Sequence, residues 1–324
     1  MKILAIETSC DETSVAILNG DDVTHVTASQ IDVHRITGGI VPEVAAREHV
    51  QVMIPIIKEI MQKTVLIPDD IDRIAVTSGP GLITSLMVGV ETARTLAYSW
   101  NKPLFSINHI EGHIAANFIG NPDIEFPAVA LVVSGGHTEL LFVPKPGTYE
   151  LIGATRDDAA GECFDKCARI LGLDYPGGPE ISKLAAKGDS TIHHLPSPML
   201  DSDNSDFSFS GLKTAVLYFH RDNPDAKLED VCASIENAIV NVLVAKTKKA
   251  LKVHGAKSLL VGGGVAANSA LRTELENLNA NIYIPAPEFC TDNAAMIAAA
   301  CRFHEQPTDL FSFKANPNWE LTPR

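Results

Sequence analysis

Short apolar runs separated by polar turns predict a three-strand meander at the start of the chain, and the same pattern returns later. Runs of about four to eight apolar residues bounded by turn residues are typical of buried β-strands. The expected strands are 3–7, 14–18 and 23–29 in the first meander and 128–133, 139–143 and 149–154 in the second. In both meanders the turn after the first strand is polar, at 8–13 and at 134–138. The chain therefore carries two matched copies of one strand pattern.

The match between the two copies continues beyond the meanders. Each copy adds a strand, a glycine-rich turn and a helix, at 73–77, 78–81 and 82–98 in the first and at 258–261, 262–264 and 267–278 in the second. An internal repeat of this kind predicts two like lobes, and ligands in such α/β folds bind at the carboxyl ends of the strands. We expect an α/β fold whose lobes, residues 1–106 with 293–324 and residues 107–292, enclose a central cleft.

Two histidines four positions apart, His109 and His113, lie on a predicted helix. That spacing places both imidazoles on one helix face, where they can share a metal ion. Asp292 is the third candidate, because it occupies the position in the second copy that His109 occupies in the first. Each follows the last glycine of its glycine-rich turn, Gly264 or Gly81, by 28 positions. Two imidazoles and one carboxylate leave coordination positions open, as a catalytic metal requires. We expect the imidazoles of the first copy and the carboxylate of the second to share one metal.

The turns of the two copies also favour a phosphate-bearing ligand. Ser134, Gly135 and Gly136 lie between two predicted strands, and consecutive backbone N–H groups in such a turn can cradle a phosphate or a developing oxyanion. Asn268 is predicted one turn into the helix that follows the second glycine run, where it would face the same cleft. Together with the acidic turn at Asp11, these features indicate a nucleotide.

Charge limits the classes of partner. The chain has 324 residues and a formal net charge of −14, which argues against indiscriminate nucleic-acid binding, because that binding depends on neutralising phosphates. The stretch between Glu236 and Glu274 nevertheless contains no carboxylate. Its basic residues are Lys246, Lys248, Lys249, Lys252, Lys257 and Arg272. A solvated helix face and an RNA-facing edge both remain open for this stretch.

The chain has the features of a cytoplasmic protein. Its six cysteines are scattered, which suits reduced thiols better than a disulfide framework. No apolar run reaches the roughly 18 to 20 residues of a membrane-spanning helix. The acidic residues Glu7 and Asp11 come too early for a signal peptide. We therefore expect a cytoplasmic location and no membrane partner.

Several sequence motifs, taken together, resemble one known family. In order they are IETSCDET at 6–13, GGIVPE at 38–43, SGPG at 78–81, HxxxH at 109–113, VSGGHT at 133–138, YPGGP at 175–179, FSGLK at 209–213, GGGVAAN at 262–268 and CTDN at 290–293. They resemble the bacterial branch of the TsaD/Kae1 family, within the actin/Hsp70/sugar-kinase-like (ASKHA) superfamily. This resemblance implies a duplicated two-lobed fold with a central cleft.

The resemblance also implies an activity. Members of this family are tRNA N6-adenosine threonylcarbamoyltransferases, which transfer the threonylcarbamoyl group of threonylcarbamoyl-AMP to adenosine 37 of tRNA. It implies that His109, His113 and Asp292 bind one divalent metal, with Fe²⁺ the first choice and Zn²⁺ or Mg²⁺ as alternatives. The implied substrate-binding residues are Val132, Val133, Ser134, Gly135, Gly136, Asp165, Gly178 and Asn268. A TsaB-like paralogue and a TsaE-like ATPase are the implied protein partners.

Two positions depart from the family pattern. Archaeal and eukaryotic relatives have a tyrosine metal ligand where this chain has Val132, so we expect no fourth protein ligand from that position. Some bacterial relatives have an acidic residue at the position of Ser182, which leaves a ribose contact there open.

The transfer needs an acceptor for the proton of the adenine amine. Asp11 is our first candidate and His137 the second, and Glu12 is expected to orient Asp11.

Three other classes of function stay open on the sequence alone. A small-molecule kinase on the same scaffold needs a catalytic aspartate but no paired histidines. A metalloprotease is disfavoured, because Glu111 comes two positions after His109, whereas the zinc-protease motif has its glutamate directly after the first histidine. The third is a nucleotide-gated interaction module without chemistry of its own.

Overall fold

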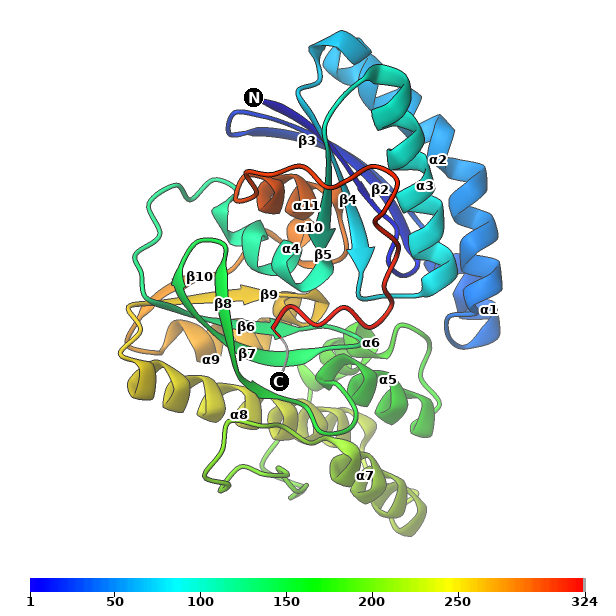
Figure 1. Ribbon diagram of the computed structural model, residues 1–324. Coiled ribbons are helices and arrows are strands. Elements are labelled where there is room, and N and C mark those ends of the chain that lie inside the picture. The colour runs from blue at the N-terminus through cyan, green and yellow to red at the C-terminus, as the bar shows by residue number, and fades with distance from the viewer. Residues whose placement is uncertain (323–324) are drawn as a thin grey trace. The chain divides into compact units, whose positions relative to one another are not determined.

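The computed structural model describes residues 1–322, which divide into two compact units (Figure 1). Unit 1 comprises Met1–Ile124 together with the segment from Pro285 onward, and unit 2 comprises Glu125–Ile284. The lobe boundaries expected from the sequence lie elsewhere, at 107 and 292. The segments 107–124 and 285–292 belong to unit 1, where the helix at 109 packs against the helix that follows Asp292.

Unit 1 contains a five-stranded mixed sheet in the order β3-β2-β1-β4-β5. Its strands are β1 (Lys2–Glu7), β2 (Glu12–Asn19), β3 (Asp22–Ser29), β4 (Arg73–Gly79) and β5 (Leu104–Asn108). β1 pairs antiparallel with β2 and parallel with β4, so the first three strands form the predicted meander and the next two extend it. Because β4 and β5 run parallel to β1, their carboxyl ends lie at the same edge of the sheet.

Helices cover both faces of this sheet. The helices of unit 1 are α1 (Ile31–Thr37), α2 (Pro42–Thr64), α3 (Ile83–Trp100), α4 (His109–Ala115), α10 (Pro287–Cys290) and α11 (Ala294–Cys301), with 3₁₀ turns at Pro68–Asp70 and Ala116–Phe118. Leu4 and Ile6 pack in one cluster with residues of α2 and α3, whereas Ile3 and Ala5 pack in another with α4 and α11. This alternation follows from the period of two along a strand. α11 is buried along its whole length, which fixes the chain segment that carries Asp292 against unit 1.

Unit 2 repeats the same sheet. Its order is β10-β9-β6-β7-β8, which matches unit 1 strand for strand when read from the other edge. The strands are β6 (Ala128–Val133), β7 (Thr138–Lys145), β8 (Thr148–Ala154), β9 (Ser258–Gly262) and β10 (Asn281–Tyr283). β6 pairs antiparallel with β7 and parallel with β9, as β1 does with β2 and β4. The duplication predicted from the sequence is therefore confirmed.

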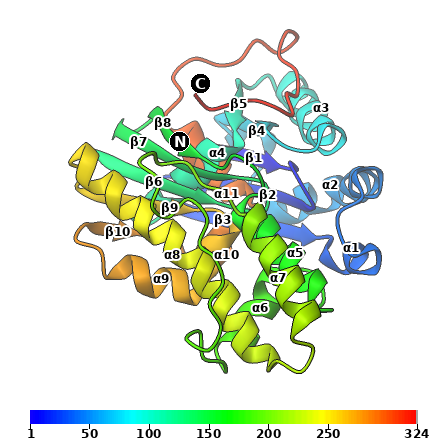
Figure 2. The same cartoon turned by 90° about the horizontal axis from the view of Figure 1, so that it is seen from below.

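The helices of unit 2 include one long segment. They are α5 (Ala160–Ile170), α6 (Gly177–Ala185), α7 (Ser210–Asp222), α8 (Leu228–His254) and α9 (Ser269–Glu276), with a 3₁₀ turn at Gly264–Ala267. α8 packs against β6 and β7 and runs along the sheet of unit 2, as Figure 2 shows. Lys246 on α8 is buried and donates to the carbonyl oxygens of Ser202 and Asn204 at 3.5 and 2.7 Å, so this lysine does not lie on a solvated face.

One predicted helix differs from the structure. The helix expected at 267–278 is a 3₁₀ turn followed by α9, and Asn268 caps α9 instead of lying one turn inside a helix. Its side-chain oxygen accepts a hydrogen bond from the N–H of Leu271 at 2.8 Å. Asparagine is among the residues preferred at this position, because its side chain satisfies a backbone donor that has no partner within the helix.

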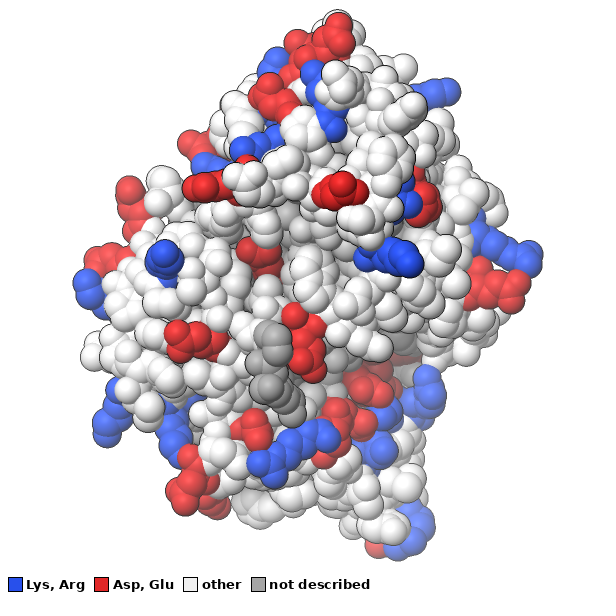
Figure 3. Space-filling model, in the orientation of Figure 1, with Lys and Arg blue, Asp and Glu red and all other residues white. Residues whose placement is uncertain are grey.

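Two surface properties bear on partners. Among the described residues, no helix is both long enough and apolar enough to cross a membrane. Acidic and basic side chains are interspersed over the face of the molecule shown in Figure 3.

Candidate metal centre and substrate loops

The metal candidates on α4 are placed by a helix cap. Asn108 ends β5, and its side-chain oxygen accepts from the N–H groups of Ile110 and Glu111 at 2.8 and 3.4 Å. This cap starts α4 at His109, directly at the carboxyl end of a strand. One helical turn later His113 lies on the same face, with the two ring centroids 4.6 Å apart. Both imidazoles are buried.

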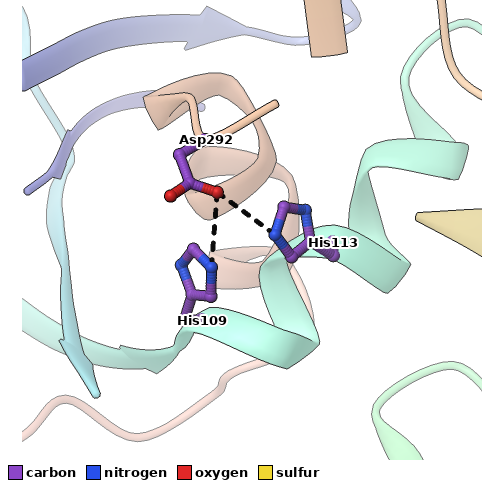
Figure 4. Close-up of side chains that lie close together, drawn as sticks. All are labelled: His109, His113 and Asp292. Carbon is purple, nitrogen blue, oxygen red and sulfur yellow. Dashed lines mark ion pairs between the residues drawn. The ribbon is translucent and has the colours of Figure 1, made fainter. Parts of the chain in front are cut away.

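Asp292 completes a cluster of three ligands (Figure 4). Its Oδ1 lies 3.4 Å from Nε2 of His109 and 3.3 Å from Nε2 of His113. One ligand atom from each residue falls within 4.8 Å of the other two. The carboxylate lies just before α11, whose N-cap is the next residue, Asn293.

All three residues of this cluster belong to unit 1. The expectation that the imidazoles and the carboxylate come from different halves is therefore wrong. The physical reason is the apolar helix α11, which buries its alanine-rich surface against β1, β2 and α4 and so returns Asp292 to unit 1.

The burial of His113 supports a metal. Neither imidazole nitrogen of His113 has a hydrogen-bond partner among the described residues, although both are buried. The 3.3 Å separation between its Nε2 and Asp292 lacks the alignment of a hydrogen bond. A buried polar atom without a partner costs about 1–3 kcal/mol, and a bound cation would remove that cost. The donor set of two imidazoles and a carboxylate suits divalent iron or zinc, and leaves positions open for substrate.

The surrounding charges also favour a cation. Burial raises the pKa of Asp11, and the negative charge of Asp292 raises it further. Burial also raises the pKa of Glu12, to about 9, with further contributions from the charges of Asp292 and Asp11. Burial alone would lower the pKa of His109, but the carboxylates of Asp292 and Glu7 outweigh it and raise that pKa to about 9. These shifts share one physical origin, which is an excess of carboxylates around a buried point. A divalent metal would neutralise that excess.

The pKa of His113 is shifted in the opposite direction to that of His109. Burial, and then the positive charge that His109 would carry, lowers the pKa of His113. A neutral imidazole is the form that binds a metal.

Glu111 lies on α4 between the two histidines, but its carboxylate pairs with a residue outside the cluster. Its carboxylate is buried and pairs with Nε2 of His304 at 2.9 Å. This contact raises the pKa of His304. A protease base needs its carboxylate beside the metal-bound water, so the pair with His304 argues against a metalloprotease.

In unit 2 the turn between β6 and β7, which the sequence predicts to cradle a phosphate, is closed by two hydrogen bonds. The N–H of Ser134 donates to the carbonyl of His137 at 2.8 Å, and the N–H of His137 donates to the Ser134 hydroxyl at 3.1 Å. Gly135 and Gly136 lie exposed at the tip, and a Cβ added to either would meet nothing within 4 Å. Neither has a positive φ, so the backbone of the described structure does not demand glycine there. The close approach of a ligand would explain both glycines.

The remaining substrate candidates lie in unit 2, on the elements around this turn. Val132 and Val133 are the last residues of β6 and their side chains are fully buried in the core. Asp165 on α5 accepts from the N–H of Gly177 at 2.7 Å and so holds the start of α6, where Gly178 is the second residue. The structure thus places Asp11 and Glu12 near the candidate metal ligands in unit 1, and the other candidates in unit 2.

A cavity of about 390 Å³ lies beside Asn268, between α6, α8 and α9. Ser182 and Glu236 line it, and the Ser182 hydroxyl donates to the Glu236 carboxylate at 2.7 Å. The side-chain amide of Asn268 donates to both, at 2.8 Å and 2.6 Å. Glu236 is not among the site residues expected from the sequence. The available signal was a carboxylate within a mostly apolar stretch of α8, at a position that the structure shows to be buried.

Comparison with known families gives a result that covers most of the chain. The model of the TsaD family, described as tRNA N6-adenosine threonylcarbamoyltransferase, matches residues 23–299. The relative of that name from Kosmotoga olearia is 50% identical over 303 residues, which are 92% of each chain. The relative of that name from Bacillus subtilis is 48% identical over 335 residues, covering 99% of this chain and 96% of its own.

Two solved structures share the fold. Component A of the (R)-2-hydroxyglutaryl-CoA dehydratase from Acidaminococcus fermentans matches with a TM-score of 0.57 at 15% identity, over 94% of this chain and 99% of its own. The activator of the 2-hydroxyisocaproyl-CoA dehydratase from Clostridium difficile, with bound ADPNP, matches with a TM-score of 0.56 at 18% identity, over 94% of each chain. At such identities the likeness shows the fold alone, and it agrees with the two-lobed ASKHA-type α/β fold predicted from the sequence.

The family resemblance first suggested by the sequence motifs is confirmed by these matches. With a family model that spans residues 23–299 and relatives of one name over nearly its whole length, the chain belongs to the TsaD family of tRNA N6-adenosine threonylcarbamoyltransferases.

Proposed function

We propose that this chain transfers the threonylcarbamoyl group of threonylcarbamoyl-AMP to N6 of adenosine 37 in tRNA, in the cytoplasm, at a site that holds one divalent metal. The observation that carries the proposal is the cluster of His109, His113 and Asp292, which meets the needs of a catalytic metal in a chain of this family. Fe²⁺ is the proposed ion, because a cluster of two imidazoles and one carboxylate is typical of non-haem iron sites.

The reaction joins a weak nucleophile to an activated carbonyl. The lone pair of the adenine amine is delocalised into the ring, so the carbonyl must carry a good leaving group. A bond forms between N6 and the carbamoyl carbon, the bond from that carbon to the phosphate oxygen breaks, and AMP leaves with the electron pair. When bound, the metal supplies Lewis-acid stabilisation of negative charge on the substrate oxygens.

Residues of the chain complete the chemistry. The N–H groups of Gly135 and Gly136 would receive negative charge that develops on the substrate, because no side chain of their own stands in the way. Asp11 would accept the N6 proton, and Glu12 would orient it. His137, on the same turn as the two glycines, is the second candidate for the base.

The cavity of unit 2 suits the adenosine part of the adenylate. Glu236 and Ser182 present a carboxylate and a hydroxyl at its wall, and the side-chain amide of Asn268 donates to both of them at 2.6 and 2.8 Å. A carboxylate is a strong acceptor for a ribose hydroxyl. In this chain Glu236 would supply the carboxylate that Ser182 lacks.

Two further proteins are proposed as partners, a TsaB-like paralogue and a TsaE-like ATPase. Unit 1 offers apolar surface for such a contact, because Val50 and Ile54 on α2 and Ile83 and Met87 on α3 are each 43% to 63% exposed. Scattered exposed apolar residues are normal, but an apolar pair one turn apart on a helix presents a stripe against which another helix can pack.

The direct test is a reconstituted transfer assay. The purified chain, its partner proteins, synthetic threonylcarbamoyl-AMP and unmodified tRNA transcript are combined, and modified nucleoside is measured by mass spectrometry. Modified adenosine is expected with the wild-type chain and with His220→Ala, which alters an exposed histidine on α7, but not with His109→Ala. Unchanged modification by His109→Ala would contradict the proposed metal site, and phosphorylation of a small molecule by the chain would favour the kinase alternative.

A further inference from the structure

Glu7 is a buried carboxylate at the end of β1 that the chemistry above does not use. Its side chain has no solvent exposure. Oε1 accepts a hydrogen bond from the N–H of Ser9 at 2.5 Å, and Oε2 accepts one from the hydroxyl of Thr77. A carboxylate buried in a core is strongly unfavourable unless it is hydrogen-bonded and paired. These contacts hold Glu7 in one orientation from the turn after β1 and from β4.

The same carboxylate contacts His109, the first residue of α4. Oε2 of Glu7 lies 3.2 Å from Nδ1 of His109, and the Ser9 hydroxyl lies 3.1 Å from that nitrogen. The other ring nitrogen, Nε2, faces Asp292 at 3.4 Å. Because Nδ1 and Nε2 are on different edges of the imidazole, the ring separates Glu7 from the ligand cluster. Glu7 is therefore not a ligand of an ion bound at Nε2.

An anionic partner at Nδ1 decides the tautomer of the ring. A carboxylate accepts the Nδ1 proton, so the lone pair of the neutral imidazole is on Nε2, directed toward Asp292. His113 lacks such a partner, since neither of its ring nitrogens is hydrogen-bonded within the described residues. One of the two metal imidazoles is thus fixed by a buried carboxylate and the other is not.

We propose that Glu7 is a positioning residue of the metal centre, which fixes the orientation and tautomer of His109 and so tightens the binding of a divalent cation. The inference rests on the proposed metal site and adds to it a residue outside the ligand set. Carboxylate partners of metal-bound histidines typically contribute about 10- to 100-fold in metal affinity. Glu7 acts through His109 and touches neither substrate nor metal.

The test measures metal binding by the full chain, without its activity. Co²⁺ is titrated against a chromophoric chelator, and the visible absorption of the bound Co²⁺ reports its ligand geometry. Glu7→Gln keeps the length of the side chain and an acceptor for Ser9, but removes the charge. We expect Co²⁺ affinity to fall about 10- to 100-fold and the absorption band to shift. Glu111→Gln is the matched control, because it also removes a buried carboxylate at the metal helix, but one paired with His304, and should change affinity less than about twofold.

A second variant covers the case in which Glu7→Gln does not fold. Thr77→Val leaves the carboxylate in place and removes one of the groups that hold it. It should lower Co²⁺ affinity by a smaller factor, about threefold, with a broadened absorption band. Wild-type affinity and spectrum in folded Glu7→Gln, or in Thr77→Val where Glu7→Gln fails to fold, would overturn the inference and leave the metal site standing. A wild-type chain that binds no Co²⁺ would overturn the metal site and the inference together.

Discussion

The turns that follow the first strand of each unit occupy the same place in a duplicated fold and differ in charge. In unit 1 the turn after β1 leads to Asp11 and Glu12, with Glu7 buried at the strand end. In unit 2 the turn after β6 consists of Ser134, two glycines and His137, with no carboxylate. One scaffold thus carries acidic side chains after this turn in one copy and an exposed pair of glycines in the turn of the other.

This difference supports the proposed division of the chemistry between the copies. Carboxylates gathered around buried imidazoles favour a cation, whereas exposed N–H groups in a glycine turn favour an anion. Unit 2 uses carboxylates as well, but away from this turn. Asp157, just after β8, accepts from the N–H groups of Phe209 and Ser210 and the hydroxyls of Ser208 and Ser210, and so caps α7. The role of Asp157 is therefore structural, whereas the carboxylates of unit 1 are proposed to serve a metal ion.

The largest expected effect concerns the cation side. Asp292→Ala removes the only carboxylate among the three proposed ligands. Because loss of a residue that only supports a ligand costs about 10- to 100-fold in metal affinity, loss of a ligand should cost more than about 100-fold. Metal content after dialysis, measured by plasma mass spectrometry, checks this. Asp189→Ala, an acidic substitution in unit 2 at a residue that bonds to Thr191, should keep the wild-type metal content. Equal metal content in Asp292→Ala and Asp189→Ala would show that the cation does not depend on the carboxylate of unit 1.

Asp11→Ala should reduce turnover rather than substrate binding. A general base contributes about 10²- to 10⁴-fold, so transfer at saturating threonylcarbamoyl-AMP should fall at least about 100-fold. Binding of the adenylate, measured by calorimetry, should stay within about threefold of wild type, because its phosphate is assigned to the turn of unit 2. Turnover within a few-fold of wild type would exclude Asp11 as the base.

Gly135→Ala tests the anion side. A methyl group has open space there, so stability should be unchanged, but the methyl would crowd the phosphate. Adenylate binding should weaken about tenfold, or about 1.4 kcal/mol. Gly263→Ala is the matched contrast, since Gly263 has φ of +93° and an added Cβ would clash with the Val133 carbonyl. That substitution should destabilise the fold by more than about 1 kcal/mol in chemical denaturation. Loss of stability in Gly135→Ala would show that the turn needs glycine for its own conformation.

Asp157→Asn should have the smallest effect and should depend on pH. Burial would raise the pKa of Asp157, but hydrogen bonds from Ser208, Phe209 and Ser210 outweigh it and lower that pKa. A carboxyl whose pKa is lower in the folded chain contributes stability above its unfolded pKa, about 3.9, and loses it as the pH falls through the folded value. The wild-type chain should therefore be more stable than Asp157→Asn by about 0.5 kcal/mol at pH 7, since solvent screens this exposed carboxylate, and the difference should shrink below about pH 4. A difference independent of pH would rule out the ionised cap.

The strands and the duplication could be predicted because their signal is local. Apolar runs and glycine turns have a period that a single segment reveals, and the spacing of His109 and His113 reveals a shared helix face. The assignment of Asp292 to a lobe failed, because it depends on where α11 packs, and α11 is buried against unit 1. The spacing of residues along the sequence does not predict against which unit this helix packs.

The contacts that support the site could not be predicted for the same reason. Glu7 meets His109 across 102 positions, and Ser182 meets Glu236 across 54. Pairs so distant leave no periodic pattern, and a lone carboxylate at a strand end or within a helix is read as a solvated group. Asn268 is a predicted substrate-binding residue, and its role as the cap of α9 follows only from the hydrogen bond to Leu271.

The central claim is that His109, His113 and Asp292 share one metal ion. Anomalous diffraction from crystals of the Fe²⁺- or Zn²⁺-loaded protein, collected on both sides of the metal absorption edge, tests it most directly. We predict one strong peak about 2.0–2.2 Å from Nε2 of His109, Nε2 of His113 and a carboxylate oxygen of Asp292. A metal peak bound by other residues, with these three side chains not in contact with it, would contradict the claim.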